Sequence, residues 1–203
     1  MKNSQDSHPP ISREQILETM MTAIIHRGPD QGKSWISEHA ALGFRRLSII
    51  DLEGSVQPMA NETGNLVLVF NGEIYNYREL RQELTLAGHR FSTQGDSEVL
   101  LHGYEEWGEH LPEHLRGMFA FAIWDEAKEQ LYAARDPFGI KPFTMRSRKD
   151  AFSSPRRSRA YCLTPPIKKS STRRPWSNIS PSSTPPWKKH SFRGYVSFAL
   201  AIS

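Results

Sequence analysis

Three consecutive polar positions follow an apolar run in the first half of the chain. Residues 66–69 predict a buried strand, and Asn71, Gly72 and Glu73 come directly after it. Asn-Gly after a strand usually starts a hairpin, but residues 76–87 have the composition of a helix. Such a strand end can bring a side-chain amide, a backbone N–H and a carboxylate together. The first two could form an oxyanion hole, and the carboxylate could bind an ammonium group.

Two other polar residues extend this chemistry. Arg46 lies in the expected strand FRRLSII, where its guanidinium could bind a carboxylate through two parallel hydrogen bonds. Asp96 stands at an expected helix start in TQGDSE and could be a second anchor for an ammonium group. A ligand with a carboxylate, an α-ammonium group and a reactive carbonyl would satisfy all of these residues. Glutamine has all three groups.

Each position also has a purely structural interpretation. Asn71 and Gly72 can form a turn, Asp96 can be an N-cap, and Arg46 can be a solvated strand residue. His26, in the stretch HRGPD, can be an ordinary loop histidine. The residue patterns alone leave both interpretations open.

Apolar periodicity predicts the elements that hold these residues. Ser12 and Gln15 form a capping box at the start of a helix. Further helices are expected over 77–87, with Gly88 as C-cap, from Asp96 or Ser97 to Trp107, and over 111–116. Strands are expected over 41–50, 66–70, 118–124 and 130–135, the last two as a hairpin. This order predicts an α+β fold with mainly antiparallel sheets.

Composition excludes several classes of protein. No run of 18 apolar residues is present, so no membrane-spanning helix and no membrane partner are expected. The first ten residues lack the apolar centre of a signal peptide. Cys162 is the single cysteine, which excludes a disulfide framework and makes a cytoplasmic location the default expectation.

Charge divides the chain into two regions. Residues 1–150 carry 16 basic and 22 acidic side chains, whereas residues 151–203 carry 10 basic side chains and no acidic one. The second region also holds seven of the 14 prolines and 12 serines. Such a composition buries too little apolar surface to offset chain entropy, which predicts a disordered tail.

Seven sequence blocks in fixed order resemble one family. They are HRGPDQG (26–32), RRLSIID (45–51), QPM (57–59), FNGEIYNYREL (70–80), GDSEVLLHGYEEWG (95–108), LRGMFAFAIWD (115–125) and ARDPFGIKP (134–142). Together they resemble the N-terminal class II glutamine amidotransferase domain of glutamine-hydrolysing asparagine synthetase. The resemblance implies the αββα sandwich of the N-terminal-nucleophile hydrolases. It also implies a domain at 11–143 that is incomplete at both ends, between an atypical N-terminus (1–10) and a tail (144–203).

The resemblance gives the same residues specific roles. Arg46 matches the arginine that holds the glutamine α-carboxylate, and Asn71 and Gly72 match the oxyanion-hole pair. Glu73 and Asp96 match the acidic positions of the glutamine pocket. Family members are often homodimers, and they bind ATP and magnesium in a separate synthetase domain. No cofactor or metal is therefore expected in this chain, and glutamine is the expected partner.

The sequence departs from the family at the nucleophile. The family uses an N-terminal cysteine, whereas Lys2 occupies that position and no cysteine precedes Cys162. The sequence therefore predicts no glutaminase activity for this chain, and whether it is an enzyme stays open. A non-catalytic glutamine-binding module and a non-functional truncated product are the alternatives. The acceptor of the amide group in the parent enzyme stays open too.

The tail has two interpretations. Its sudden loss of acidic residues is typical of a coding frame read out of register, with the shift near 143–153. The alternative is a genuine basic arm for nucleic acid or a phospholipid surface. No recognised nucleic-acid fold accompanies it, so the first interpretation is favoured and no nucleic-acid partner is expected.

Overall fold

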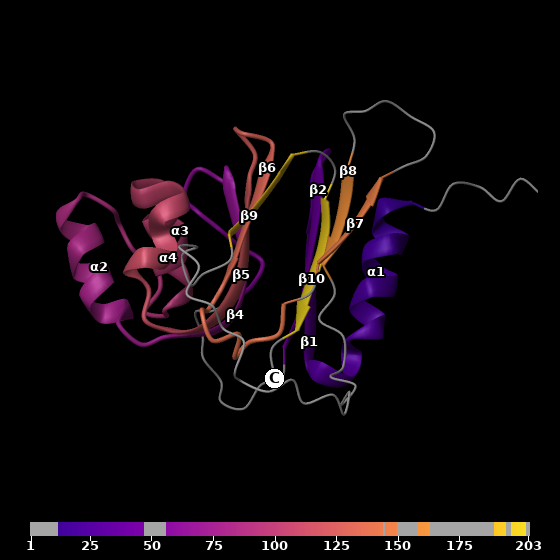
Figure 1. The fold of residues 1–203 in the computed structure, drawn as a ribbon, viewed down its shortest axis with the longest axis horizontal. Coiled ribbons are helices and arrows are strands. Elements are labelled where there is room, and N and C mark those ends of the chain that lie inside the picture. The colour runs from indigo at the N-terminus through magenta and orange to yellow at the C-terminus, as the bar shows by residue number, and fades with distance from the viewer. Residues whose placement is uncertain are drawn as a thin grey trace, which may run out of the picture.

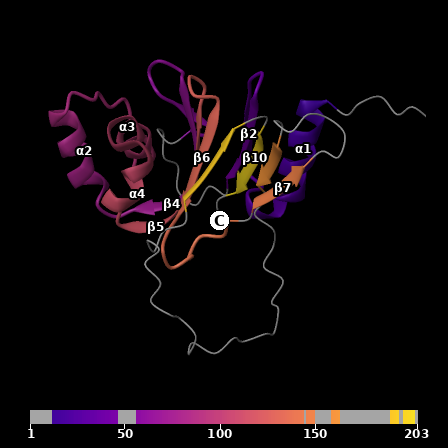
Figure 2. The ribbon, with the colours of Figure 1, turned by 45° about the horizontal axis from the view of Figure 1, so that its top comes forward.

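Two five-stranded sheets face each other between layers of helices in the computed structural model (Figure 1). The structure describes residues 12–46, 56–143, 145–149, 158–162, 189–193 and 196–201. Helix α1 (Arg13–Ala23) covers one sheet, and α2 (Tyr77–Leu86), α3 (Ser97–Trp107) and α4 (Leu111–His114) lie beyond the other, as Figure 2 also shows. The α+β class and the αββα layering expected from the sequence are confirmed.

The sheet beside α2 and α3 is entirely antiparallel. Its strand order is β3-β4-β5-β6-β9, with bounds Met59–Ala60, Leu66–Ile74, Gly117–Asp125, Gln130–Arg135 and Lys189–Arg193. The hairpin expected over 118–124 and 130–135 is present as β5 and β6. β3 pairs with β4 only through residues 67 and 68, so the rest of that edge of β4 has no neighbouring strand in the described part of the chain.

The second sheet has the order β1-β2-β10-β8-β7, and β10 is parallel to both of its neighbours. The bounds are Gln31–Ile36, Ala40–Arg46, Val196–Ala201, Ser158–Cys162 and Met145–Lys149. β1 was not predicted from the sequence, because its residues, QGKSWI, are mostly exposed and show no alternation of apolar residues. The expected strand over 41–50 is β2 up to residue 46, and residues 47–50 lie outside the described part.

Four strands of the structure, β7 to β10, fall within 144–203, the region that the sequence predicts to be a tail. The rest of that region, like residues 1–11, lies outside the described residues. The division of the chain at residue 143 and the frameshift hypothesis therefore stay predictions. Among the described residues, no helix is long and apolar enough to cross a membrane.

The helix ends follow the local signals in the sequence. The capping box of Ser12 and Gln15 is formed at the start of α1. After α2, Gly88 has a positive φ of 106°, and its N–H bonds to the carbonyl of Thr85 while the N–H of His89 bonds to the carbonyl of Leu84. These two bonds form a Schellman motif, which fixes where the chain leaves the helix. The described residues also form two 3₁₀ turns, Ile25–Arg27 and Gly108–His110.

Alternation along β4 divides the core into two layers. Leu66, Leu68 and Phe70 pack against α2 and α3, whereas Val67 and Val69 pack between the two sheets. A continuous apolar strand is the pattern expected when both faces of a sheet are covered. This arrangement decides which way the polar residues at the end of β4 point.

We expect Leu84→Ala to destabilise the protein by about 2–5 kcal/mol, because this fully buried side chain joins α2 to the sheet. Leu86, on the same helix, is 89% exposed and provides the matched control, with an expected change below about 0.5 kcal/mol. Urea unfolding monitored by circular dichroism measures both. Equal losses in the two variants would contradict the packing of α2 described here.

Candidate functional site

The free edge of β4 carries three backbone N–H groups beyond the last pair with β3. The N–H of Phe70 donates to Oε1 of Gln57 at 2.6 Å, and that of Ile74 donates to Oδ2 of Asp96 at 2.9 Å. Gly72 lies midway between them, so its N–H points to the same edge. Among the described residues no acceptor lies within hydrogen-bond distance of this N–H. A donor with no acceptor in the described part of the chain is thus flanked by two that are already bonded.

Glycine is required at this point of the strand. A Cβ on Gly72 would lie 2.1 Å from the carbonyl oxygen of Met118 and 2.7 Å from Cα of Phe119. Gly117 faces β4 in the same way, since its Cβ would lie 2.1 Å from the carbonyl oxygen of Glu73. The two glycines let β4 and β5 approach closely where the open N–H is presented.

The side chains of Asn71 and Glu73 point away from the face of β4 that packs against α2 and α3. They continue the alternation of Val67 and Val69, so both lie on the face of β4 that looks toward the other sheet. Asn71 is buried at 1% exposure, whereas Glu73 is exposed. The amide therefore lies at the end of the core between the sheets, and the carboxylate lies at its rim.

Asp96 joins this group through space. Burial raises the pKa of its carboxyl, the hydrogen bond from Ile74 opposes that rise, and the negative charge of nearby Glu73 adds to it. Two carboxylates held together in this way favour a cation between them. Asp96 occupies the N-cap position of α3, yet its side chain makes no capping bond. Asp96 is therefore the N-cap residue, as the structural interpretation expected, but its carboxylate bonds to β4 and not to the N-terminus of α3.

Glu98 positions Asp96, and the sequence analysis missed it. Its carboxylate accepts hydrogen bonds of 2.6–2.8 Å from the backbone N–H and hydroxyl groups of both Ser92 and Thr93. Burial raises the pKa of Glu98, but these four bonds outweigh it, and the net pKa is lowered. The charged carboxylate holds the loop that leads into Asp96. The Ser-Thr pair six and five residues earlier is a signal that could have indicated this bond.

Asn76, the second asparagine of FNGEIYNY, has a structural task. Its Oδ1 accepts from the N–H of Arg116, and its Nδ2 donates to the carbonyl of His114, both at 2.9 Å. The N–H of Tyr75 also bonds to the carbonyl of Arg116. These bonds tie the turn from β4 into α2 to the segment that leads into β5.

Arg46 is the last residue of β2 and is half-buried. It continues the alternation of Leu42 and Phe44, so it lies on the face of its sheet that looks toward β4. A Cβ on Gly28 would lie 2.5 Å from its backbone nitrogen, so the HRGPD loop packs directly on this strand end. His26 is exposed, and it lies in the 3₁₀ turn Ile25–Arg27 and not in a loop as expected.

The structure thus brings four of the five expected site residues together, around the end of β4. Asn71, Gly72 and Glu73 are consecutive on the strand, and Asp96 bonds to it from α3. Arg46 stands on the facing sheet, with its side chain on the same inter-sheet side as Asn71. The arrangement places the Gly72 N–H and the Asn71 amide next to two neighbouring carboxylates, those of Glu73 and Asp96.

Comparison with known proteins identifies the family of the chain. Residues 5–179 match the family model described as "Glutamine amidotransferase domain". Asparagine synthetase [glutamine-hydrolyzing] 1 of Bacillus subtilis is 48% identical over 148 residues, which cover 72% of this chain and 23% of the relative. Asparagine synthetase [glutamine-hydrolyzing] 3 of the same organism is 39% identical over 180 residues, which cover 86% and 29%. The chain thus spans less than a third of either relative.

Among solved structures, a glutamine phosphoribosylpyrophosphate amidotransferase from B. subtilis matches with a TM-score of 0.40 and 28% identity, over 47% of this chain and 23% of that one. The family model covers most of the chain and contains every residue of the site. The chain therefore belongs to the glutamine amidotransferase family, and it is similar to the N-terminal domain of asparagine synthetases.

Proposed function

We propose that this chain binds glutamine at the end of β4, and that its family role is to release ammonia from glutamine for amide formation. The observation that carries the proposal is the open N–H of Gly72, held between two bonded neighbours. An amide carbonyl of glutamine that accepts from this N–H and from the Asn71 side chain would be polarised, and the oxyanion formed on attack would be stabilised.

The charged groups fit the other end of the ligand. Glu73 and Asp96 would hold the α-ammonium group, which also relieves the repulsion between the two carboxylates. Arg46, on the facing sheet, would bind the α-carboxylate. Recognition of both charged ends would favour a free amino acid over a glutamine inside a peptide.

The reaction of the family needs a nucleophile, and the residues assigned here to the site do not include one. The single cysteine of the chain is Cys162, in β8, and the family nucleophile is an N-terminal cysteine. We propose that a polypeptide of this sequence binds glutamine without hydrolysing it. In the family setting, ATP, magnesium and aspartate would be bound by a synthetase domain outside these residues, and asparagine would be the product.

We expect glutamine to raise the melting temperature of the protein, because a ligand that binds only the native state stabilises it. Asp96→Asn should abolish this rise, since the ammonium group loses a carboxylate. The ligand-free melting temperature should stay equal or increase, because an amide oxygen can still accept from Ile74 and a buried charge is removed.

Glu83→Gln is the matched control for this measurement, because Glu83 is an exposed carboxylate of α2 away from the site. Its glutamine response should equal that of the unchanged protein. An unchanged response in Asp96→Asn would contradict the assignment of the ammonium site. No response in the unchanged protein would instead favour the non-functional product.

Glutamine affinity should fall as the pH is lowered from neutral through the pKa of Asp96. That pKa is raised above 3.8, and only the ionised carboxylate attracts the ammonium group. The stability of the glutamine-free protein depends on pH in the opposite direction. Because the pKa of Asp96 is raised in the folded protein, ionisation of this carboxyl as the pH rises lowers the free energy of unfolding. Isothermal titration calorimetry from neutral to acidic pH measures the affinity, and a constant affinity over that range would contradict the role of Asp96.

We expect the purified chain to release no ammonia from glutamine above the rate of a buffer blank. A coupled glutamate dehydrogenase assay measures ammonia directly, and B. subtilis asparagine synthetase provides the positive control. Release of ammonia by the chain would show that another residue serves as nucleophile and would overturn the proposal of binding without hydrolysis.

A further inference from the structure

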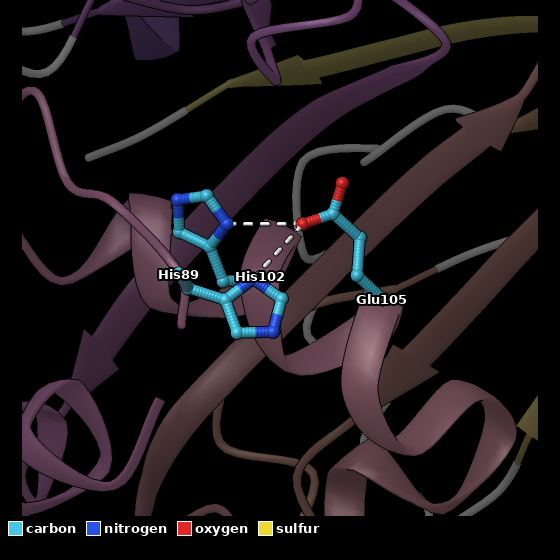
Figure 3. A group of neighbouring side chains, drawn as sticks. All are labelled: His89, His102 and Glu105. Carbon is cyan, nitrogen blue, oxygen red and sulfur yellow. Dashed lines mark hydrogen bonds and ion pairs between the residues drawn. The ribbon is translucent and has the colours of Figure 1, made fainter. Parts of the chain in front are cut away.

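Two histidines and a glutamate meet beside α3, away from the residues assigned to glutamine. Oε2 of Glu105 lies 3.0 Å from Nδ1 of His102 and 3.4 Å from Nδ1 of His89 (Figure 3). One ligand atom from each residue lies within 4.8 Å of the other two. His102 is 2% exposed, whereas Glu105 reaches the surface. The group is therefore half inside the protein and accessible from one side.

Local structure fixes these three side chains. His102 and Glu105 are three residues apart on α3, so they share one face of the helix. His89 follows Gly88 in the Schellman motif that ends α2, which directs the chain back toward α3. The edge of Phe91 packs against the His102 ring, with ring centroids 4.6 Å apart. The imidazoles are thus held in place by backbone geometry and packing.

The distances suit a tetrahedral ion. Zinc binds histidine nitrogen and carboxylate oxygen at about 2.0–2.2 Å, which places two ligand atoms of a tetrahedron about 3.3 Å apart. The distances from Oε2 of Glu105 to Nδ1 of His102 and of His89, 3.0 Å and 3.4 Å, are close to this separation between ligand atoms. An ion could bind with small side-chain movements and would leave a fourth position for water.

Polar groups also lie near the outer atoms of the three ligands, although those of His102 are beyond hydrogen-bond distance. Nε2 of His89 lies 3.3 Å from Oε2 of Glu106, and Nε2 of His102 lies 3.7 Å from carboxylate oxygens of both Glu62 and Glu98. Oε1 of Glu105 accepts from the side-chain amide of Asn61 at 2.7 Å. A metal-bound imidazole usually donates its second N–H to a carboxylate, which orients the ring and raises its basicity.

The charge of the surroundings favours a cation. Four carboxylates, those of Glu62, Glu98, Glu105 and Glu106, surround the two imidazole rings. Nε2 of His102 is buried and makes no hydrogen bond to any described residue, although two carboxylates stand near it. Charge attraction by partly buried carboxylates adds to the affinity that the nitrogen and oxygen ligands provide.

We propose that His89, His102 and Glu105 form a binding site for a divalent transition-metal ion of the zinc class. Imidazole nitrogen suits zinc, cobalt, nickel and copper, whereas magnesium and calcium prefer oxygen ligands. The ion joins the loop after α2 to α3, and Glu98 ties the same loop to α3 a few residues further on. Its binding stiffens the segment that leads into Asp96.

Titration of the metal-free chain with zinc in a calorimeter tests the proposal. We expect one ion per chain and a higher melting temperature, with no response to magnesium. Cobalt in place of zinc should give the intense visible absorption of a tetrahedral site. Absence of stoichiometric zinc binding would overturn the proposal and would leave the cluster as an ion-pair network between histidines and glutamates.

Variants locate the ion. His89→Ala and Glu105→Gln change side chains outside the apolar core, and each should weaken zinc binding by more than about 100-fold, since loss of an outer partner alone costs about 10–100-fold. His110→Ala is the control, because His110 and Glu113 form a similar pair at 3.0 Å on the surface, and within the described ranges this pair belongs to no group of three possible metal ligands. Unchanged binding in the first two variants, or loss in the control, would contradict the assignment. Circular dichroism confirms that each variant is folded.

Discussion

The pattern of hydrogen bonds along the free edge of β4 is the constraint on which the candidate site depends. Gln57 and Asp96 accept from the backbone of β4 on either side of Gly72, and so they fix the strand while leaving its central donor available. Gly72 is half-buried, and its N–H has no acceptor among the described residues, which leaves it available for a role in binding. The same bond from Asp96 also brings α3 to the strand end.

Glycines and side-chain hydrogen bonds hold the free edge of β4 in place. Gly72 and Gly117 allow β4 and β5 to approach where any side chain would collide with backbone. Asn76 ties the end of β4 to the segment before β5, and Glu98 holds the loop that precedes Asp96. The proposed metal cluster lies on the same helix and the same loop. Binding of a metal there and binding of glutamine at the strand end would therefore stiffen neighbouring parts of one element.

The sequence predicted the fold class, the helices and the central hairpin, because their apolar periodicity is strong and their caps are local. It also singled out Asn71, Gly72, Glu73 and Asp96, which the structure brings together, but their functional roles depend on a family resemblance and stay predictions. It missed β1, whose residues are exposed, and it missed Glu98 and Asn76, whose bonds are visible only once the loops are folded. The proposed metal cluster could not be found from sequence spacing. His102 and Glu105 lie on α3, but His89 comes from the turn after α2 and reaches them only in the folded chain.

The most direct measurement is a titration of the ¹⁵N-labelled chain with glutamine, followed by nuclear magnetic resonance of the backbone amides in β4. If glutamine binds as proposed, the Gly72 amide signal should shift strongly and its hydrogen exchange should slow. The amide of Phe70, already bonded to Gln57, should change little. A bound state in which the Gly72 signal stays unchanged would contradict the assignment of this strand edge as the glutamine site.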